Sequence, residues 1–268
     1  MHIASLAVML DQIVFSCRNP EKEKLIRAEP RMYIGLSLLI ALMIPGFILG
    51  LRDVFTITLR NEGISFPLLI GFGIGTLIYY LILRRKHAFT NLEHELTHAF
   101  MALLLFRRIT SFRSGSDGGY VSHSGGFGGE IGNIVIRLAP YSLPTFAFIF
   151  ALIRPLTPPY VFPYYDAVTG LTLGYHTFST IHEIKFNFHK RTFFYAGTNT
   201  PTLSDIGQTG YILSTVLIIF LTLLFHGIFF AVLTMNYSGI LKFFSLSWNY
   251  SEGFLISFYF QIKKVLVM

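Results

Sequence analysis

Residues 94–106 read His-Glu-Leu-Thr-His-Ala-Phe-Met-Ala-Leu-Leu-Leu-Phe, and the interpretation of the whole chain depends on this stretch. Its first five residues match the pattern H-E-x-x-H, which places two imidazoles one helical turn apart on one face of a helix. Two such imidazoles can bind one zinc ion, with the glutamate beside them as general base. The residues that follow, 99–106, are all apolar. Because ionisable groups are costly inside a membrane unless they have a function, the sequence predicts a metalloenzyme site within a membrane.

The composition is that of a membrane protein. Hydrophobic residues make up 53% of the chain and charged residues 13%, whereas a soluble domain carries about 25% charged residues. Apolar runs long enough to cross a bilayer occur at roughly six places, 33–51, 65–83, 91–106, 132–153, 161–182 and 207–235. We therefore expect an all-α fold, a polytopic bundle of about six transmembrane helices.

The chain divides by composition into three parts. Residues 1–32 form a charged lead-in on the cytoplasmic side or at the interface, 33–235 the membrane-embedded domain, and 236–268 an aromatic tail at the membrane interface. Asp11 interrupts the apolar start of the chain, so we expect no cleaved signal peptide. Cys17 is the only cysteine, which excludes a disulfide framework and a cysteine-based metal site.

The net charge of +7 comes from Lys and Arg residues spread among the loops between the spans. We interpret it as a signal of membrane orientation and expect no nucleic-acid partner. The basic residues are more numerous in the lead-in, in loop 84–90 and near the C-terminus than in the alternate loops. This bias predicts a multi-pass protein of a bacterial or archaeal cytoplasmic membrane, with both termini in the cytoplasm.

Two further segments have a predicted role. The glycine-rich loop 114–129 is either a flexible linker or, because Tyr120 and Val121 interrupt it, a short extended element beside the site. The glycines within 71–75 indicate close helix packing. At the start of the third span, Thr90 and Glu93 match a capping box, which assigns Glu93 to the backbone and leaves Glu95 for chemistry.

A catalytic zinc normally has three protein ligands, so His94 and His98 need a partner. The candidates are Asp117, His123, Asp166, His176, Glu183, Asp205 and His226. Spans three and five enter from the same side in the expected topology, which puts Asp166, in the first turn of its helix, at nearly the depth of the histidines. His176 would lie about 15 Å deeper, and Asp205 near the opposite membrane face. Asp166 is thus the predicted ligand, with His176 and Asp205 as alternatives.

The chain resembles the site-2 protease class of intramembrane zinc metalloproteases, the M50-type peptidases. The resemblance rests on H-E-x-x-H at 94–98 in a membrane helix, a glycine-rich loop, a further span and a helix that opens with Asp166. It covers roughly residues 65–215 and implies a three-helix catalytic core, one zinc ion per chain on His94, His98 and Asp166, and Glu95 as base. The residues around Asp166 depart from the family, which commonly has Pro-Asp-Gly or Leu-Asp-Gly there.

Two functions remain open from the sequence. The first is an endopeptidase that hydrolyses membrane-spanning or membrane-associated proteins in the lipid bilayer, with Glu95 taking a proton from water and Asn133 stabilising the oxyanion or positioning the substrate. The second is a metal-binding or metal-transport protein that is not an enzyme and uses His94, His98 and His176. A transporter has no obvious need for Glu95, which favours the protease.

Overall fold

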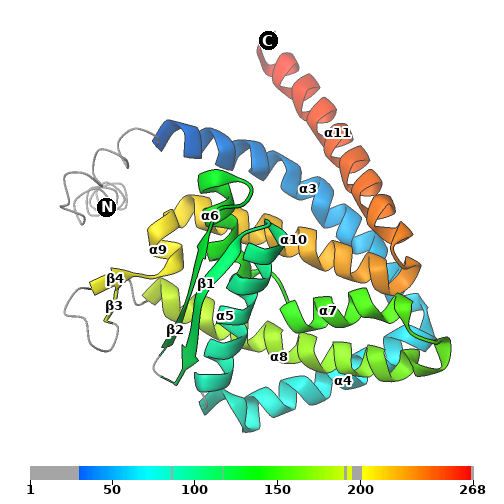
Figure 1. Ribbon diagram of the computed structural model, residues 1–268. Coiled ribbons are helices and arrows are strands. Elements are labelled where there is room, and N and C mark those ends of the chain that lie inside the picture. The colour runs from blue at the N-terminus through cyan, green and yellow to red at the C-terminus, as the bar shows by residue number, and fades with distance from the viewer. Residues whose placement is uncertain (1–29, 86, 117, 190–191, 195–200, 267–268) are drawn as a thin grey trace, which may run out of the picture. The chain divides into compact units, whose positions relative to one another are not determined.

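The computed structural model describes residues 30–268 except 86, 117, 190–191, 195–200 and 267–268 (Figure 1). The predicted lead-in 1–32 lies almost wholly outside the described residues. The chain forms two units, Met1–Leu39 and Ile40–Met268, and all the contacts discussed below lie within the second unit.

The described part is mostly helical, with two small antiparallel hairpins. Its α-helices are α3 (Pro30–Arg60), α4 (Glu62–Leu81), α5 (His87–Leu104), α6 (Gly129–Leu138), α7 (Thr145–Ile153), α8 (Phe162–His189), α9 (Asp205–Thr209), α10 (Tyr211–Met235) and α11 (Ser238–Leu266). Its strands are β1 (Arg108–Gly115), β2 (Gly118–Ser124), β3 (Thr192–Phe194) and β4 (Pro201–Leu203). Within the tail predicted at 236–268, residues Ser238–Leu266 form a single long helix, α11.

Three of the described helices are long and apolar enough to cross a membrane: the part of α3 at Ile34–Arg60, α4, and α10. A fourth span is possible if α6 and α7 are taken together, although the two halves of that pair are bent by 94°. Pro144 lies at this break, directly before α7, where it lacks the amide hydrogen that a continuous helix would use. Six spans are thus not confirmed, and α5 and α8 differ from the apolar helices because both carry many polar groups.

Helices α4 and α8 cross with their backbones in close contact. A Cβ atom added to Gly71 or Gly75 of α4 would lie 1.9 Å from a carbonyl oxygen of α8, that of Ala167 or Leu171. In turn, a Cβ atom on Gly170 of α8 would lie 2.0 Å from the carbonyl oxygen of Leu68. Small residues four positions apart allow this approach, so the close helix packing predicted for 71–75 is confirmed.

The glycine-rich segment begins as an ordered hairpin. Strands β1 and β2 pair antiparallel from Arg108 opposite Ser124 to Gly115 opposite Gly118. The hairpin packs on α5, and the Asn91 side chain of that helix donates a 2.8 Å hydrogen bond to the Gly115 carbonyl. Of the two predicted alternatives, the extended element is therefore the one observed.

Candidate metal centre

His94 and His98 lie one turn apart in the middle of α5, and their ring centroids are 4.7 Å apart. The hairpin of β1 and β2 packs against one side of α5, and Glu183 of α8 contacts His94 on another side. The side chains of both histidines are largely buried, with 16% and 12% of their surfaces exposed. The predicted pair of imidazoles is thus present on one helix face.

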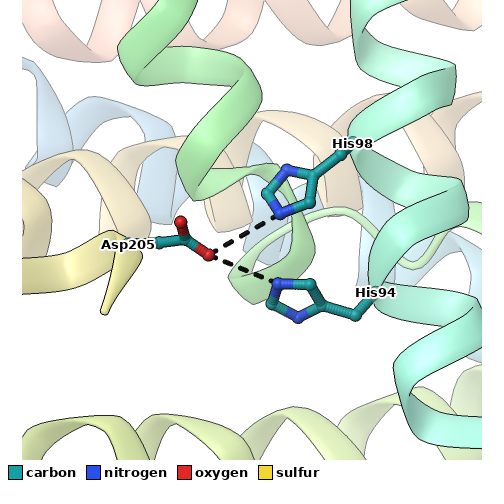
Figure 2. Close-up of side chains that lie close together, drawn as sticks. All are labelled: His94, His98 and Asp205. Carbon is teal, nitrogen blue, oxygen red and sulfur yellow. Dashed lines mark hydrogen bonds and ion pairs between the residues drawn. The ribbon is translucent and has the colours of Figure 1, made fainter. Parts of the chain in front are cut away.

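Asp205 provides the third group. Ser204 caps the short helix α9 by accepting a hydrogen bond from the Gly207 amide, which makes Asp205 the first helical residue. Its Oδ2 atom lies 3.3 Å from Nε2 of His94 and 3.6 Å from Nε2 of His98. Figure 2 shows both rings turned toward this single carboxylate oxygen. Among the described residues, these three side chains form the one group of histidine, cysteine and acidic residues whose ligand atoms all lie within 4.8 Å of one another.

The spacing of these atoms fits a zinc ion. Ligand atoms about 2.0–2.1 Å from a tetrahedral zinc are about 3.3–3.4 Å from one another. The distances of 3.3 and 3.6 Å from Asp205 to the two histidines are close to that value. Two imidazole nitrogens and one carboxylate oxygen are also a donor set found in catalytic zinc sites, which leave a fourth position for water or substrate.

The partners of the other ring nitrogens support the same conclusion. His94 Nδ1 lies 3.0 Å from Oε2 of Glu183 on α8, and His98 Nδ1 lies 2.8 Å from the Ile136 carbonyl of α6. Both partners only accept hydrogen bonds, so each Nδ1 carries the hydrogen and each neutral ring has its lone pair on Nε2. Two lone pairs and a carboxylate oxygen then face one another. A proton or a metal ion is needed between them, and histidine ligands of metal ions are commonly held in this way.

The charge of Asp205 also suits a ligand. Burial raises the pKa of its carboxyl group, but protonated His94 and His98 rings outweigh burial and lower that pKa below its ordinary value, as a bound cation in the same place would. Asp205 is therefore ionised at neutral pH.

A cavity of about 280 Å³ adjoins the three groups. It is lined by His94, Glu95, His98, Gly119, Tyr120, Val121, His123, Asn133, Ile136, Arg137 and Asp205. Glu95 is 7% exposed. A Cβ atom on Gly119 of β2 would lie 2.5 Å from Cγ of Glu95, so only a glycine lets the strand approach the glutamate this closely.

Asn133 lies in the wall of this cavity, but most of its amide is engaged. Its Oδ1 accepts a hydrogen bond from Arg107, and its Nδ2 donates one to Glu130 at 2.9 Å. One amide hydrogen remains for a bound molecule. Arg137 lines the cavity as well, and its guanidinium donates a long hydrogen bond of 3.4 Å to Thr209 of α9.

Asp166, the predicted third ligand, is not part of the group. It is fully buried, and its two carboxylate oxygens accept hydrogen bonds of 2.6 and 3.1 Å from Arg154. Helices α5 and α8 are offset, since Phe89 near the start of α5 meets Tyr175 in the middle of α8 edge to face. The residues from Asp166 to Glu183 cover about 25 Å of helix, which separates Asp166 from His94. The prediction was wrong because it placed the first turns of both helices at the same depth.

His176 makes its hydrogen bonds away from His94 and His98, whereas the metal-transport hypothesis needs the three histidines along one path. Its Nδ1 donates a 2.9 Å hydrogen bond to Glu93, and its Nε2 lies 3.2 Å from the Thr180 hydroxyl. The capping box is also wrong, because α5 begins at His87 and the Glu93 side chain points into the bundle to pair with His176. This buried pair is separate from the candidate metal centre.

Four ligand candidates remain, and one of them, His123, lines the cavity without belonging to the group of three. Glu183 contacts the metal centre only through His94, a role that sequence reasoning missed because Glu183 was expected near the opposite face. His226 lies beside the Thr222 carbonyl of its own helix, with a 2.9 Å hydrogen bond. Asp117 lies outside the described residues.

No protein-family model, curated protein or solved structure matches this chain.

Proposed function

We propose that this chain is an intramembrane zinc metalloprotease of the site-2 protease kind, with one zinc ion on His94, His98 and Asp205. One observation carries the proposal: two Nε2 lone pairs and a carboxylate oxygen converge on one point, beside the buried Glu95. If the three ligands only held a structural metal ion, the same cavity would not need the carboxylate of Glu95 in addition to that of Asp205.

The chemistry divides among the residues as follows. A bound zinc would polarise the peptide carbonyl and make water more acidic. Glu95 takes a proton from water as the peptide carbonyl is attacked, and it returns that proton to the departing amine. Glu183 and the Ile136 carbonyl hold the two imidazoles in the tautomer that presents Nε2. Asn133 offers its remaining amide hydrogen to the substrate.

The hairpin supports a polypeptide as the substrate. Strand β2 pairs with β1, and its residues Gly119, Tyr120 and Val121 line the cavity. In the described part of the chain, no strand pairs with the other edge of β2. An unwound segment of a membrane protein can add there as a strand, which brings its peptide carbonyls next to the cavity with little sequence selectivity.

In the membrane we assign crossings to α3, α4, α8 and α10 and to one of the two segments between α4 and α8, because α4 and α8 pack in the same direction, with Gly71 beside Ala167 and Gly75 beside Leu171. The polar groups of α5 and α8 that lower their hydropathy are paired inside the bundle, such as Glu93 with His176. The N-terminal side of α3 is assigned to the cytoplasm, and α11 to the interface. The lipid bilayer is thus a partner of the chain along with its protein substrate.

The test is cleavage of transmembrane substrates by purified protein reconstituted in vesicles. The chosen variant is Glu95→Gln, and the matched control is Glu62→Gln, which makes the same change at an exposed residue at the start of α4. Loss of a general base lowers the rate by about 10²–10⁴-fold. We expect that loss for Glu95→Gln alone, with equal zinc content in all three proteins. Equal cleavage by Glu95→Gln and wild type would exclude the mechanism, and zinc binding without cleavage would favour a non-enzymatic metal-binding protein.

A further inference from the structure

His123 lines the same cavity without belonging to the metal group. It lies on β2 at alternate positions with Gly119 and Val121, so all three share the strand face that is partly buried toward α5. Its sequence neighbours Ser122 and Ser124 lie on the exposed face. A titratable ring in the wall of a catalytic cavity needs an explanation that the ligand set and Glu95 do not supply.

The neighbour of His123 determines where its proton lies. Nδ1 of the ring is 3.3 Å from a guanidinium nitrogen of Arg107. A guanidinium stays protonated in proteins and only donates hydrogen bonds, so this Nδ1 accepts, and the hydrogen of the neutral ring is on Nε2. Burial and the charge of Arg107, in that order of importance, lower the pKa of His123, which keeps the ring neutral at pH 7. No hydrogen bond to Nε2 of His123 is seen among the described residues.

Arg107 is itself held firmly. It is 6% exposed, and one guanidinium nitrogen donates to the carbonyls of Phe127 and Gly129 at 3.2 and 2.7 Å. The segment that follows β2 packs closely against this side chain. A Cβ atom on Gly126 would lie 2.3 Å from Cγ of Arg107, and one on Gly132 would lie 2.7 Å from its guanidinium. The glycines that follow the hairpin thus make room for Arg107, and Arg107 in turn orients His123.

We propose that His123 donates a hydrogen bond from Nε2 to the substrate carbonyl oxygen as that oxygen gains negative charge. The hydrogen is shared and not transferred, so the ring stays neutral throughout and no further group is needed to reload it. His123 is then a catalytic residue of the proposed reaction, and Arg107 is its positioning residue. A fixed donor of this kind acts mainly in the transition state, so its loss lowers kcat more than it changes KM. The inference rests on the proposed proteolysis.

The first test compares three variants in the reconstituted cleavage assay, with kcat, KM and zinc content measured for each. His123→Phe removes the donor, His123→Gln keeps an N–H near the position of Nε2, and Ser122→Ala is the control on the exposed face of the same strand. We expect a fall in kcat of about 10²–10³-fold for His123→Phe. Recovery of most of that loss in His123→Gln is expected, with zinc content unchanged in all variants. A His123→Phe protein that cleaves like wild type would overturn the proposal.

The second test does not depend on activity. In protein labelled with ¹⁵N at histidine, NMR distinguishes protonated from unprotonated ring nitrogens. We expect His123 with Nε2 protonated and Nδ1 unprotonated at pH 7, in both wild type and Glu95→Gln. A ring protonated on Nδ1 would contradict the proposal even if the protein is an active protease. If wild type cleaves no better than Glu95→Gln, the proposed function itself has failed, whatever the tautomer.

Discussion

At the scale of single residues, the Nδ1 atoms of His94 and His98 decide what the site can bind. Each donates to an oxygen of the protein, Glu183 for one ring and the Ile136 carbonyl for the other. Both Nε2 lone pairs therefore point at Asp205, where a proton or a metal ion must lie. The H-E-x-x-H pattern predicted the two rings and Glu95, because a helix places residues four apart on one face. It carried no information on the partners, which come from distant segments.

Glu183 provides the first prediction. Substitution by glutamine keeps the shape of the side chain but removes the charge that strengthens His94 as a ligand. Loss of such a partner typically weakens metal binding by about 10–100-fold. We expect Glu183→Gln to lose zinc to a chelator at a correspondingly lower chelator concentration. The exposed Glu252 of α11 gives the control, and Glu252→Gln should behave as wild type does. Equal zinc affinity in Glu183→Gln and wild type would remove Glu183 from the site.

Asp166 provides the second prediction, and it separates a structural carboxylate from a ligand. Asp166 and Arg154 are buried together, and Arg154 also donates to the Leu233 carbonyl at the end of α10. Removing one charge of a buried pair costs about 3–5 kcal/mol, because the other charge stays buried without a partner. We expect Asp166→Asn to unfold at a clearly lower temperature while the folded protein keeps its zinc. Loss of zinc at unchanged thermal stability would restore Asp166 as a ligand.

At the scale of elements, the stagger between α5 and α8 is what sequence analysis could not supply. Hydropathy gives the approximate extent of a helix, but its depth relative to a neighbour is decided by packing. Here the contact of Phe89 with Tyr175 and the pair of Glu93 with His176 set the offset. That offset removed Asp166 from the site. Asp205 was an alternative from the start, but nothing local marks it as a ligand, because its helix α9 is only five residues long.

The crossing of α4 and α8 provides the third prediction, because its glycines are visible in the sequence and their neighbours are now known. A Cβ atom on Gly71 would collide with the Ala167 carbonyl, whereas one on Gly73 of the same helix has no atom within 4 Å. Gly71→Ala should therefore lower the free energy of unfolding by about 1–3 kcal/mol. Gly73→Ala should be neutral or slightly stabilising, since alanine favours a helix more than glycine does. Denaturant unfolding in detergent micelles measures both, and equal effects would argue against the close crossing.

At the scale of the whole molecule, the claim is that apolar spans surround a polar centre. Composition predicted membrane insertion, and the three apolar helices agree with it. The number of crossings was harder to predict, because α5 and α8 combine a membrane-like length with buried polar side chains. The polar side chains that lower the hydropathy of α5 and α8 include residues of the candidate site, such as His94 and Glu183.

The assigned topology gives the fourth prediction, which needs cysteines placed one at a time after Cys17 is replaced. Arg84 follows α4 and is exposed, as is Asn61 between α3 and α4. With the N-terminal side of α3 in the cytoplasm, a membrane-impermeant maleimide should label Asn61→Cys from outside intact cells. Arg84→Cys should react only after the membrane is opened. Labelling of Arg84→Cys in intact cells would mean that α4 does not cross the membrane as assigned.

The most direct test of the central claim is the zinc content of purified wild type, Glu95→Gln and Asp205→Ala. We predict one zinc ion per chain in wild type and in Glu95→Gln, because Glu95 is a base and not a ligand. Asp205→Ala should hold little or no zinc after dialysis, since two imidazoles alone remain. One tightly held zinc ion per chain in Asp205→Ala, or none in wild type, would contradict the account.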